Sequence, residues 1–196
     1  MAPVGIDDVR DALAAHQPRS VLGAGLMKKA AVAAVFCESP DLSLLFIRRA
    51  ENPNDRWSGH MAFPGGRVDP GDQNPLAAAR REAKEEVDLD LHLHGRLIGE
   101  LSHISAKPRL RIPLVVLPYV FEVAEPPVLS LEPREVAEAV WVPMTYLMDP
   151  SNRELTELKV AGVNLSLPCY RYEGREIWGM TLSMVDELLR LLGVKV

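Results

Sequence analysis

Apolar runs separated by polar turns divide much of this chain into short strands. Residues 30–37 and 42–47 are two such runs, and Glu38-Ser39-Pro40-Asp41 between them supplies turn residues, which predicts a β-hairpin. Residues 51–61 and 63–74 are rich in Gly, Asp, Asn and Pro, so we interpret both stretches as loops. The same pattern predicts further extended segments at 96–101, 114–123, 136–142 and 165–172.

Helical spacing of apolar residues marks three other segments, at 6–16, 76–87 and 181–192. The middle helix follows Asn74-Pro75, where Asn can cap free backbone N–H groups and Pro fits the first turn. A short helix is expected at 144–148. Strands mixed with helices predict an α/β (α+β) sandwich around a mixed sheet. We expect residues 1–27 to form an N-terminal helix and connector, and residues 28–196 to form the main domain.

Three carboxylates share one face of the predicted helix 76–87. Glu82, Glu85 and Glu86 stand at positions i, i+3 and i+4, which lie close together at 100° per residue. An apolar stripe about a quarter-turn away should face the core, which places the carboxylates at the edge of the buried face. This stripe consists of Leu76, Ala79, Ala83 and Val87.

Crowded carboxylates at the edge of a core favour a bound cation. Like charges at i, i+4 destabilise an exposed helix by roughly 0.2–0.5 kcal/mol, and by more where water is excluded. Mg²⁺ relieves this repulsion, because it prefers a few carboxylates together with substrate phosphate. Arg81 can hold Glu85 by an i, i+4 pair. A solvated acidic helix face explains the spacing equally well, but the upstream Gly65-Gly66 allows a sharp turn close to the helix or a phosphate.

Gly66 to Leu89 resembles the Nudix box. The segment has a glycine, five residues, an acid, a spacer, Arg-Glu-x-x-Glu-Glu and an apolar close. It departs from the usual box in having Asp72 where Glu is usual, eight spacer residues at 73–80 where seven are usual, and Asp88 in place of a late glycine. The first two departures, and Ile177-Trp178-Gly179-Met180-Thr181 with the helix after it, are similar to the coenzyme A pyrophosphatase branch.

The resemblance implies a Nudix-type α/β/α sandwich and hydrolysis of a diphosphate linkage in a nucleoside diphosphate derivative. Glu82, Glu85 and Glu86 would bind Mg²⁺, with Mn²⁺ as an alternative, and the Gly65 or Gly66 carbonyl would complete the coordination. Arg81 would orient Glu85. The general base is either a glutamate of the box, such as Glu85 or Glu82, or an acid of a later loop. Glu135 is the loop candidate because it directly precedes a predicted strand, and Glu100 is weaker.

Other polar and aromatic residues are candidates for contact with the substrate. Arg48, Arg49 and Arg56 can meet phosphates, and Trp57 and His60 can stack on a base or bond to it, although each suits ordinary surface or loop packing as well. His103 and Lys107 follow a predicted strand and can line the cleft. Trp141 and Trp178 are interpreted as core or interface residues.

Coenzyme A or a related adenosine diphosphate derivative is the first substrate hypothesis, and ADP-ribose, a nucleotide sugar and an oxidised nucleoside triphosphate remain open. A second class of function is a Nudix-fold domain that binds a nucleotide without cleaving it, but such domains usually lose carboxylates of the box. An isoprenoid diphosphate isomerase ranks last, because Cys37 and Cys169 lie in apolar or strand contexts without signs of activation.

Composition and charge narrow the possible partners and the cellular location of the protein. The formal net charge is −5 and no basic block stands out, which argues against a nucleic-acid partner. No segment reaches the roughly 18 apolar residues of a membrane span, and the first residues lack the features of a signal peptide. With two scattered cysteines, reduced thiols and a cytoplasmic location are expected. The expected partner is a small diphosphate, and a homodimer is compatible with the resemblance.

Overall fold

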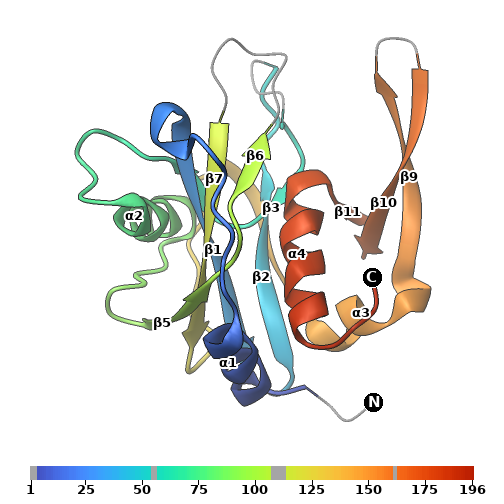
Figure 1. The fold of residues 1–196 in the computed structure, drawn as a ribbon, viewed down its shortest axis with the longest axis horizontal. Helices are drawn as coiled ribbons and strands as arrows, with labels where there is room; N and C mark the ends of the chain where they lie inside the picture. The colour runs from blue at the N-terminus through green and yellow to red at the C-terminus, as the bar shows by residue number, and fades with distance from the viewer. Residues whose placement is uncertain (1–3, 54–56, 107–113, 161–162) are drawn as a thin grey trace.

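The computed structural model describes residues 4–53, 57–106, 114–160 and 163–196, which fold around a mixed sheet with helices on both faces (Figure 1). The helical segments are α1 (Ile6–Ala15), η1 (Ala24–Leu26), α2 (Pro75–Val87), α3 (Met144–Met148), η2 (Pro150–Asn152) and α4 (Gly179–Leu191). The strands are β1 (Lys28–Glu38), β2 (Leu42–Arg49), β3 (Met61–Ala62), β4 (Gly65–Arg67), β5 (Gly95–Glu100), β6 (Ile104–Ala106), β7 (Leu114–Val123), β8 (Val136–Pro143), β9 (Arg153–Val160), β10 (Val163–Tyr172) and β11 (Arg175–Trp178).

The central sheet is mixed because β1 pairs with β7 in parallel and with β2 antiparallel. Its main order is β3-β2-β1-β7-β5, while β4 pairs with β1, β6 with β7 and β8 with β2. Phe36 faces Leu44 across the β1–β2 ladder, which confirms the predicted hairpin. The expected mixed sheet is therefore confirmed.

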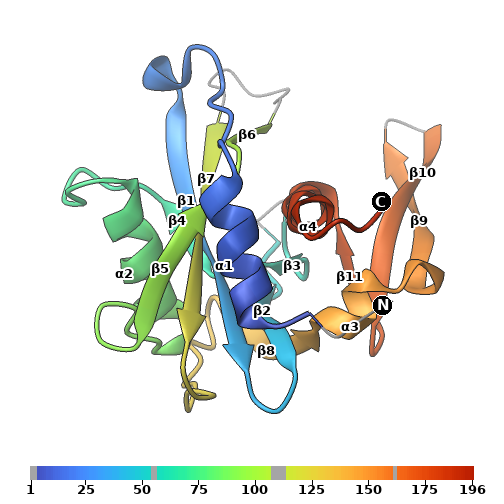
Figure 2. The same ribbon diagram turned by 60° about the horizontal axis from the view of Figure 1, so that its bottom comes forward.

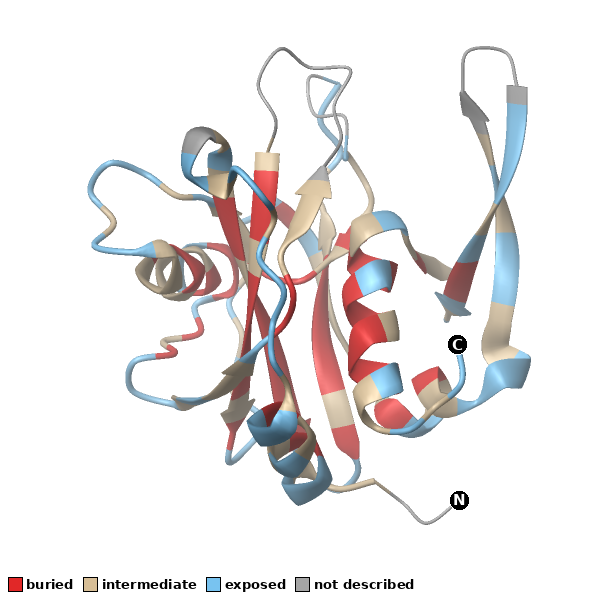
Figure 3. Ribbon diagram, viewed as in Figure 1, coloured by how far each residue is buried: buried red, intermediate tan, exposed pale blue. Residues whose placement is uncertain are grey.

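Successive residues of the central strands pack on opposite faces of the sheet, as strand geometry requires. Ala31, Ala33 and Val35 of β1 pack with α2 in one apolar cluster. Ala34 and Phe36 pack in a second cluster with buried residues of α1 and α4. Figure 2 shows α2 on one side of the sheet and α1 and α4 on the other, and Figure 3 shows the buried residues concentrated between these layers. The α/β/α arrangement is confirmed.

A second, three-stranded sheet lies beyond α4, in the order β11-β10-β9 (Figure 1). Arg153 of β9 joins this sheet to α4, because its two terminal nitrogens lie 2.7 and 2.9 Å from the two carboxylate oxygens of Asp186. The guanidinium also lies over the ring of Tyr170. This sheet supplies one wall of a cavity described below.

The interpretation of residues 63–74 as one loop was wrong at Gly65–Arg67, which form β4 and pair with Ala30–Val32 of β1. Glycines are poor strand formers, but they allow backbones to approach closely. Strands β3, β6, β9 and β11 were also not predicted. Strand β9 carries Glu154, Glu157 and Lys159 among apolar residues, and its extended form depends on pairing with β10.

The ends of α2 are defined by its sequence. The side chain of Asn74 accepts a hydrogen bond from the backbone N–H of Ala77 at 2.9 Å, which confirms the predicted start of the helix. At the other end Asp88 has φ of 58°, in the left-handed region that favours glycine. In the described part of the chain, no helix is both long enough and apolar enough to cross a membrane.

We predict that Asp88→Gly raises the free energy of unfolding by about 1 kcal/mol, because glycine adopts φ of 58° without strain. The change also removes a negative charge from the carboxyl end of the helix dipole. The exposed Lys84–Asp88 ion pair that is lost contributes less than this. Urea denaturation measures the difference. Asp88→Ala serves as the control and should lower stability, and equal stability of the two variants would contradict the explanation.

Candidate metal and active site

Among the described residues, one group of three acidic side chains has the geometry to hold a metal ion. The carboxylate oxygens of Glu82, Glu86 and Glu135 lie within 4.8 Å of one another. Glu82 and Glu86 stand one turn apart on α2, and Glu135 lies immediately before β8. The backbone N–H of Ala50, just after β2, donates to the Glu135 carbonyl at 2.8 Å and holds this loop beside the sheet. The fold thus unites acids that lie about 50 residues apart in sequence.

Glu86 is the most deeply buried member, with only 1% of its surface exposed. The pKa of its carboxyl group is raised to about 8, mainly by burial and also by the nearby Glu82 charge, while the hydrogen bond from Gly65 opposes this rise. The Gly65 backbone N–H donates to Glu86 Oε2 at 2.8 Å. Burial also raises the pKa of Glu82. Both carboxylates are therefore poorly solvated, and a cation would stabilise their charged forms.

Two glycines bring β4 against this group. A Cβ atom at Gly66 would lie 2.4–2.6 Å from the carboxylate of Glu82. The absence of a side chain at Gly66 therefore leaves the space that this carboxylate occupies. A Cβ atom at Gly65 would lie 2.3 Å from the backbone oxygen of Ala31 and 2.6 Å from the Cα of Val32. Gly65 is therefore required by the β1–β4 pairing, and Gly66 by the carboxylate.

Arg81 connects the loop before α2 to the carboxylates on the helix. Its guanidinium donates to both oxygens of Asp72 at 3.0 Å and to the Arg67 carbonyl at 3.0 Å. The same side chain donates to Glu82 at 3.0 Å and to Glu85 at 2.8 Å. The hydrogen bonds from Arg81 lower the pKa of Asp72. The Asp72 carboxylate in turn raises the pKa of Arg81, and the carboxylates of Glu82 and Glu85 raise it as well. Arg81 therefore positions acids from two parts of the motif.

The residues present fit a hard divalent cation. Such ions take oxygen ligands, and three carboxylates that converge in a partly buried place would repel one another without a counter-charge. Arg81 contacts Glu82 but not the other two members of the group in any interaction found among the described residues. Glu85 stands outside the group of three, with 57% of its side chain exposed, and shares one nitrogen of Arg81 with Glu82.

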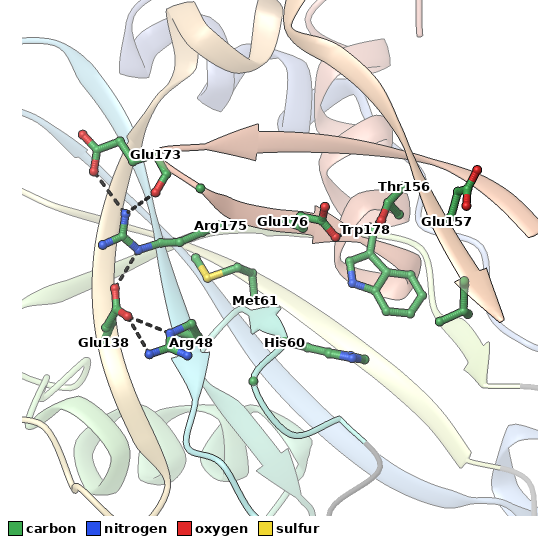
Figure 4. A pocket seen from close by; sticks show the side chains of 13 residues that line it. Arg48, His60, Met61, Glu138, Thr156, Glu157, Glu173, Arg175, Glu176 and Trp178 are labelled. Carbon is green, nitrogen blue, oxygen red and sulfur yellow. Dashed lines mark hydrogen bonds and ion pairs between the residues drawn. The ribbon is translucent and has the colours of Figure 1, made fainter.

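A cavity of about 560 Å³ lies next to Arg48, near the end of β2 (Figure 4). Arg48 and His60, both predicted to contact substrate, line this cavity. The adjoining Arg49 lies on the side of the carboxylates, where its charge lowers the pKa of Glu86. The backbone N–H of Arg49 donates to the His60 carbonyl at 3.1 Å. This hydrogen bond therefore joins a residue beside the carboxylates to a residue that lines the cavity.

The remaining predicted residues lie elsewhere or outside the described part of the chain. Trp57 is 38% exposed, and its carbonyl accepts a hydrogen bond from His60. Arg56 and Lys107 lie outside the described residues. Glu100 pairs across the sheet with Tyr119, and it is not part of the group formed by Glu82, Glu86 and Glu135. The backbone N–H of His103 donates to the Arg19 carbonyl.

Sequence reasoning missed several residues of the cavity. Glu138, Arg175 and Trp178 line it, and the His60 and Trp178 rings meet edge to face with centroids 4.8 Å apart. Trp178 was interpreted as a core or interface residue. No periodicity or motif predicts that β8 and β11 lie beside the end of β2, so the residues around this cavity are found only from the fold. Both cysteines are buried, and burial raises their pKa values, which is the opposite of activation.

Comparison with known proteins identifies the family of this chain. The NUDIX domain family matches residues 27–159. An uncharacterized Nudix hydrolase, NudL of Photorhabdus laumondii subsp. laumondii, is 32% identical over 163 residues, which cover 82% of each chain. NudL of Yersinia pestis (strain Pestoides F) is 28% identical over 168 residues, covering 85% of this chain and 81% of its own. A solved NUDIX hydrolase from Alicyclobacillus acidocaldarius shares the fold at a TM-score of 0.52 and 17% identity, covering 62% of this chain and 81% of that one.

A helix that carries clustered carboxylates, packed on a mixed sheet beside a glycine-containing strand, defines a protein with a place that could hold a metal ion. The match over residues 27–159 and the similarity to NudL specify which class this is: the chain belongs to the Nudix hydrolase family. This confirms the family that the segment from Gly66 to Leu89 resembles.

Alanine substitutions at the two glycines should separate folding from metal binding. Gly65→Ala places Cβ against backbone atoms, so we expect a loss of about 1–3 kcal/mol in the free energy of unfolding. In Gly66→Ala, the three atoms nearest to the new Cβ all belong to the movable carboxylate of Glu82. This variant should keep nearly normal stability and lose Mn²⁺ affinity.

Urea denaturation and Mn²⁺ titration measure the two properties. The explanation fails if Gly66→Ala retains the Mn²⁺ affinity of the unaltered protein, or if it unfolds as readily as Gly65→Ala.

Proposed function

We propose that this protein is an Mg²⁺-dependent hydrolase that cleaves the diphosphate linkage of a nucleoside diphosphate derivative, with coenzyme A or a related compound as the first candidate. The observation that carries the proposal is the convergence of Glu82, Glu86 and Glu135 within 4.8 Å beside Gly66. Membership of the Nudix hydrolase family supports the reaction class.

The metal would be held by Glu82 and Glu86, with Glu85 and the Gly66 carbonyl as further ligands. Glu85 is proposed because the Arg81 nitrogen that donates to Glu82 at 3.0 Å also donates to Glu85 at 2.8 Å, which keeps both carboxylates on one side. Bound Mg²⁺, or Mn²⁺ in its place, would withdraw charge from phosphoryl oxygens and lower the pKa of a bound water.

In the proposed reaction, a water oxygen forms a bond to one phosphorus, and the bond from that phosphorus to the bridging oxygen breaks. The products are two phosphate monoesters, and the attacking water loses a proton. Glu135 is the proposed acceptor of this proton, because it lies with Glu82 and Glu86 and yet belongs to an exposed loop. Glu85 and Glu82 are the alternatives from the helix.

Arg81 would act by positioning. Its bonds to Asp72 and Arg67 fix the loop, while its bonds to Glu82 and Glu85 fix the helix carboxylates. Such outer partners of metal ligands typically change metal affinity or activity by roughly 10–100-fold. Arg49 is the proposed phosphate contact, because its charge already acts on Glu86.

Coenzyme A stands first among substrates because Asp72, the eight-residue spacer and Ile177–Thr181 resemble the coenzyme A pyrophosphatase branch. ADP-ribose, a nucleotide sugar and an oxidised nucleoside triphosphate remain alternatives of the same reaction class. A Nudix-fold domain that binds nucleotide without cleaving it is disfavoured by one observation: Arg81, Glu82, Glu85 and Glu86 are all present, and the pairs that position them are formed.

Phosphate-linked turnover of a diphosphate panel with Mg²⁺ tests the proposal. The panel holds coenzyme A, ADP-ribose, NADH, a nucleotide sugar and nucleoside triphosphates. We expect at least one compound to be cleaved. Glu86→Gln should lose at least about a hundredfold in kcat/KM, because a ligand matters more than an outer partner, and Arg81→Lys should lose roughly 10–100-fold.

Glu154→Gln is a matched control, since Glu154 pairs with Arg171 in the second sheet, and this variant should keep full activity. Circular dichroism checks that each variant is folded. If no compound is cleaved and one of them raises the melting temperature, the protein is a binding domain and the catalytic proposal is wrong.

A further inference from the structure

The cavity beside β2 contains two arginines that already share one carboxylate. Arg48 donates to Glu138 Oε1 at 2.7 Å, and Arg175 donates to Glu138 Oε2 at 2.6 Å (Figure 4). Arg175 also lies 3.2 Å from a carboxylate oxygen of Glu173. The hydrogen bonds from Arg175 and Arg48 lower the pKa of Glu138, which keeps this carboxylate charged. Glu138 therefore occupies part of the hydrogen-bonding capacity of both guanidinium groups and offsets the positive charge that they would offer to a phosphate.

The charge of the cavity also opposes an anion. Among the described residues that line it, the two arginines face four carboxylates, and the latter include Glu157 and Glu176. Glu176 accepts hydrogen bonds from Arg171 and Thr156. A phosphate or carboxylate entering this space would meet excess negative charge in a partly enclosed place, where repulsion is stronger than in bulk water.

The cavity suits an uncharged polar group. Trp178, Met61 and Leu158 contribute apolar surface, while Glu157 and Glu176 offer acceptors for N–H or O–H donors. Its volume of about 560 Å³ falls in the range of small-molecule sites. It borders the same end of β2 as the three carboxylates, because Arg48 lines it and the backbone of Ala50 binds Glu135. The cavity and the carboxylates therefore both border this end of β2, where Arg48 lines the cavity and the adjacent Arg49 acts on Glu86.

We propose that this cavity binds the uncharged end of the diphosphate substrate and that Glu138 excludes an end carrying a further phosphate or carboxylate. The inference rests on the proposed function for the position of the diphosphate. For a substrate of the coenzyme A type, the uncharged end is the amide-containing arm, and the phosphorylated nucleoside lies outside the cavity.

Binding of paired probes tests this inference without any turnover. The first pair is 4′-phosphopantothenate and its terminal amide, and the second is 5′-AMP and adenosine 3′,5′-bisphosphate. Dissociation constants are measured by calorimetry with Mg²⁺ for the unaltered protein and for Glu138→Gln. In at least one pair we expect the probe without the additional charge to bind about tenfold more tightly to the unaltered protein.

In Glu138→Gln that gap should narrow to about twofold or less, because one charge is lost and Arg48 and Arg175 become available to the added anion. Glu154→Gln is the matched control and should preserve the gap. A gap that closes in either pair supports the proposal and identifies the end that enters the cavity. Equal affinities in both pairs, no binding of any probe, or a gap unchanged in Glu138→Gln overturns it. The turnover panel is judged separately, so hydrolysis can stand even if the cavity proposal fails.

Discussion

A carboxylate on the buried side of α2 is the constraint on which the site depends. Glu86 is 1% exposed, and the Gly65 backbone N–H binds it at 2.8 Å. Burying this charge beside Glu82 is unfavourable, and a cation offsets the cost. The β1–β4 pairing keeps Gly65 in place, and the bare backbone at Gly66 leaves space for the Glu82 carboxylate. Arg81 then fixes the loop against the helix. The contacts of Gly65, Gly66 and Arg81 all hold carboxylates that are poorly solvated.

Much of the fold and the helix part of the site could be predicted from the sequence. The β1–β2 hairpin, α2 and the mixed α/β sandwich follow from periodicity, turn residues and the Asn74 cap, which are local signals. Glu82, Glu85 and Glu86 also follow from local spacing, because a helix fixes which of its residues share a face. Their burial differs sharply, however, from 1% for Glu86 to 57% for the side chain of Glu85, and periodicity alone does not resolve this gradient.

The rest depends on contacts between distant segments. Strand β4 was taken for loop, because glycine has a low strand preference and only the pairing with β1 makes Gly65–Arg67 extended. Strand β9 mixes charged and apolar residues, and pairing with β10 determines its form. Arg48 was a candidate for contact with phosphate, and its pairing with Glu138, a residue 90 positions away, could not be read from the sequence. The cavity around Arg175 and Trp178 requires the second sheet, and no signal in the sequence places that sheet beside the end of β2.

The most direct test of the central claim is a crystal structure of the protein soaked with Mn²⁺, with the metal located by its anomalous scattering. The account predicts an anomalous peak bound by the carboxylates of Glu82 and Glu86, close to the Gly66 backbone and to Glu135. The peak should disappear in Glu86→Gln crystals grown under the same conditions. A peak elsewhere on the surface, or one that persists unchanged in Glu86→Gln, would contradict the view that the buried carboxylate organises a metal site.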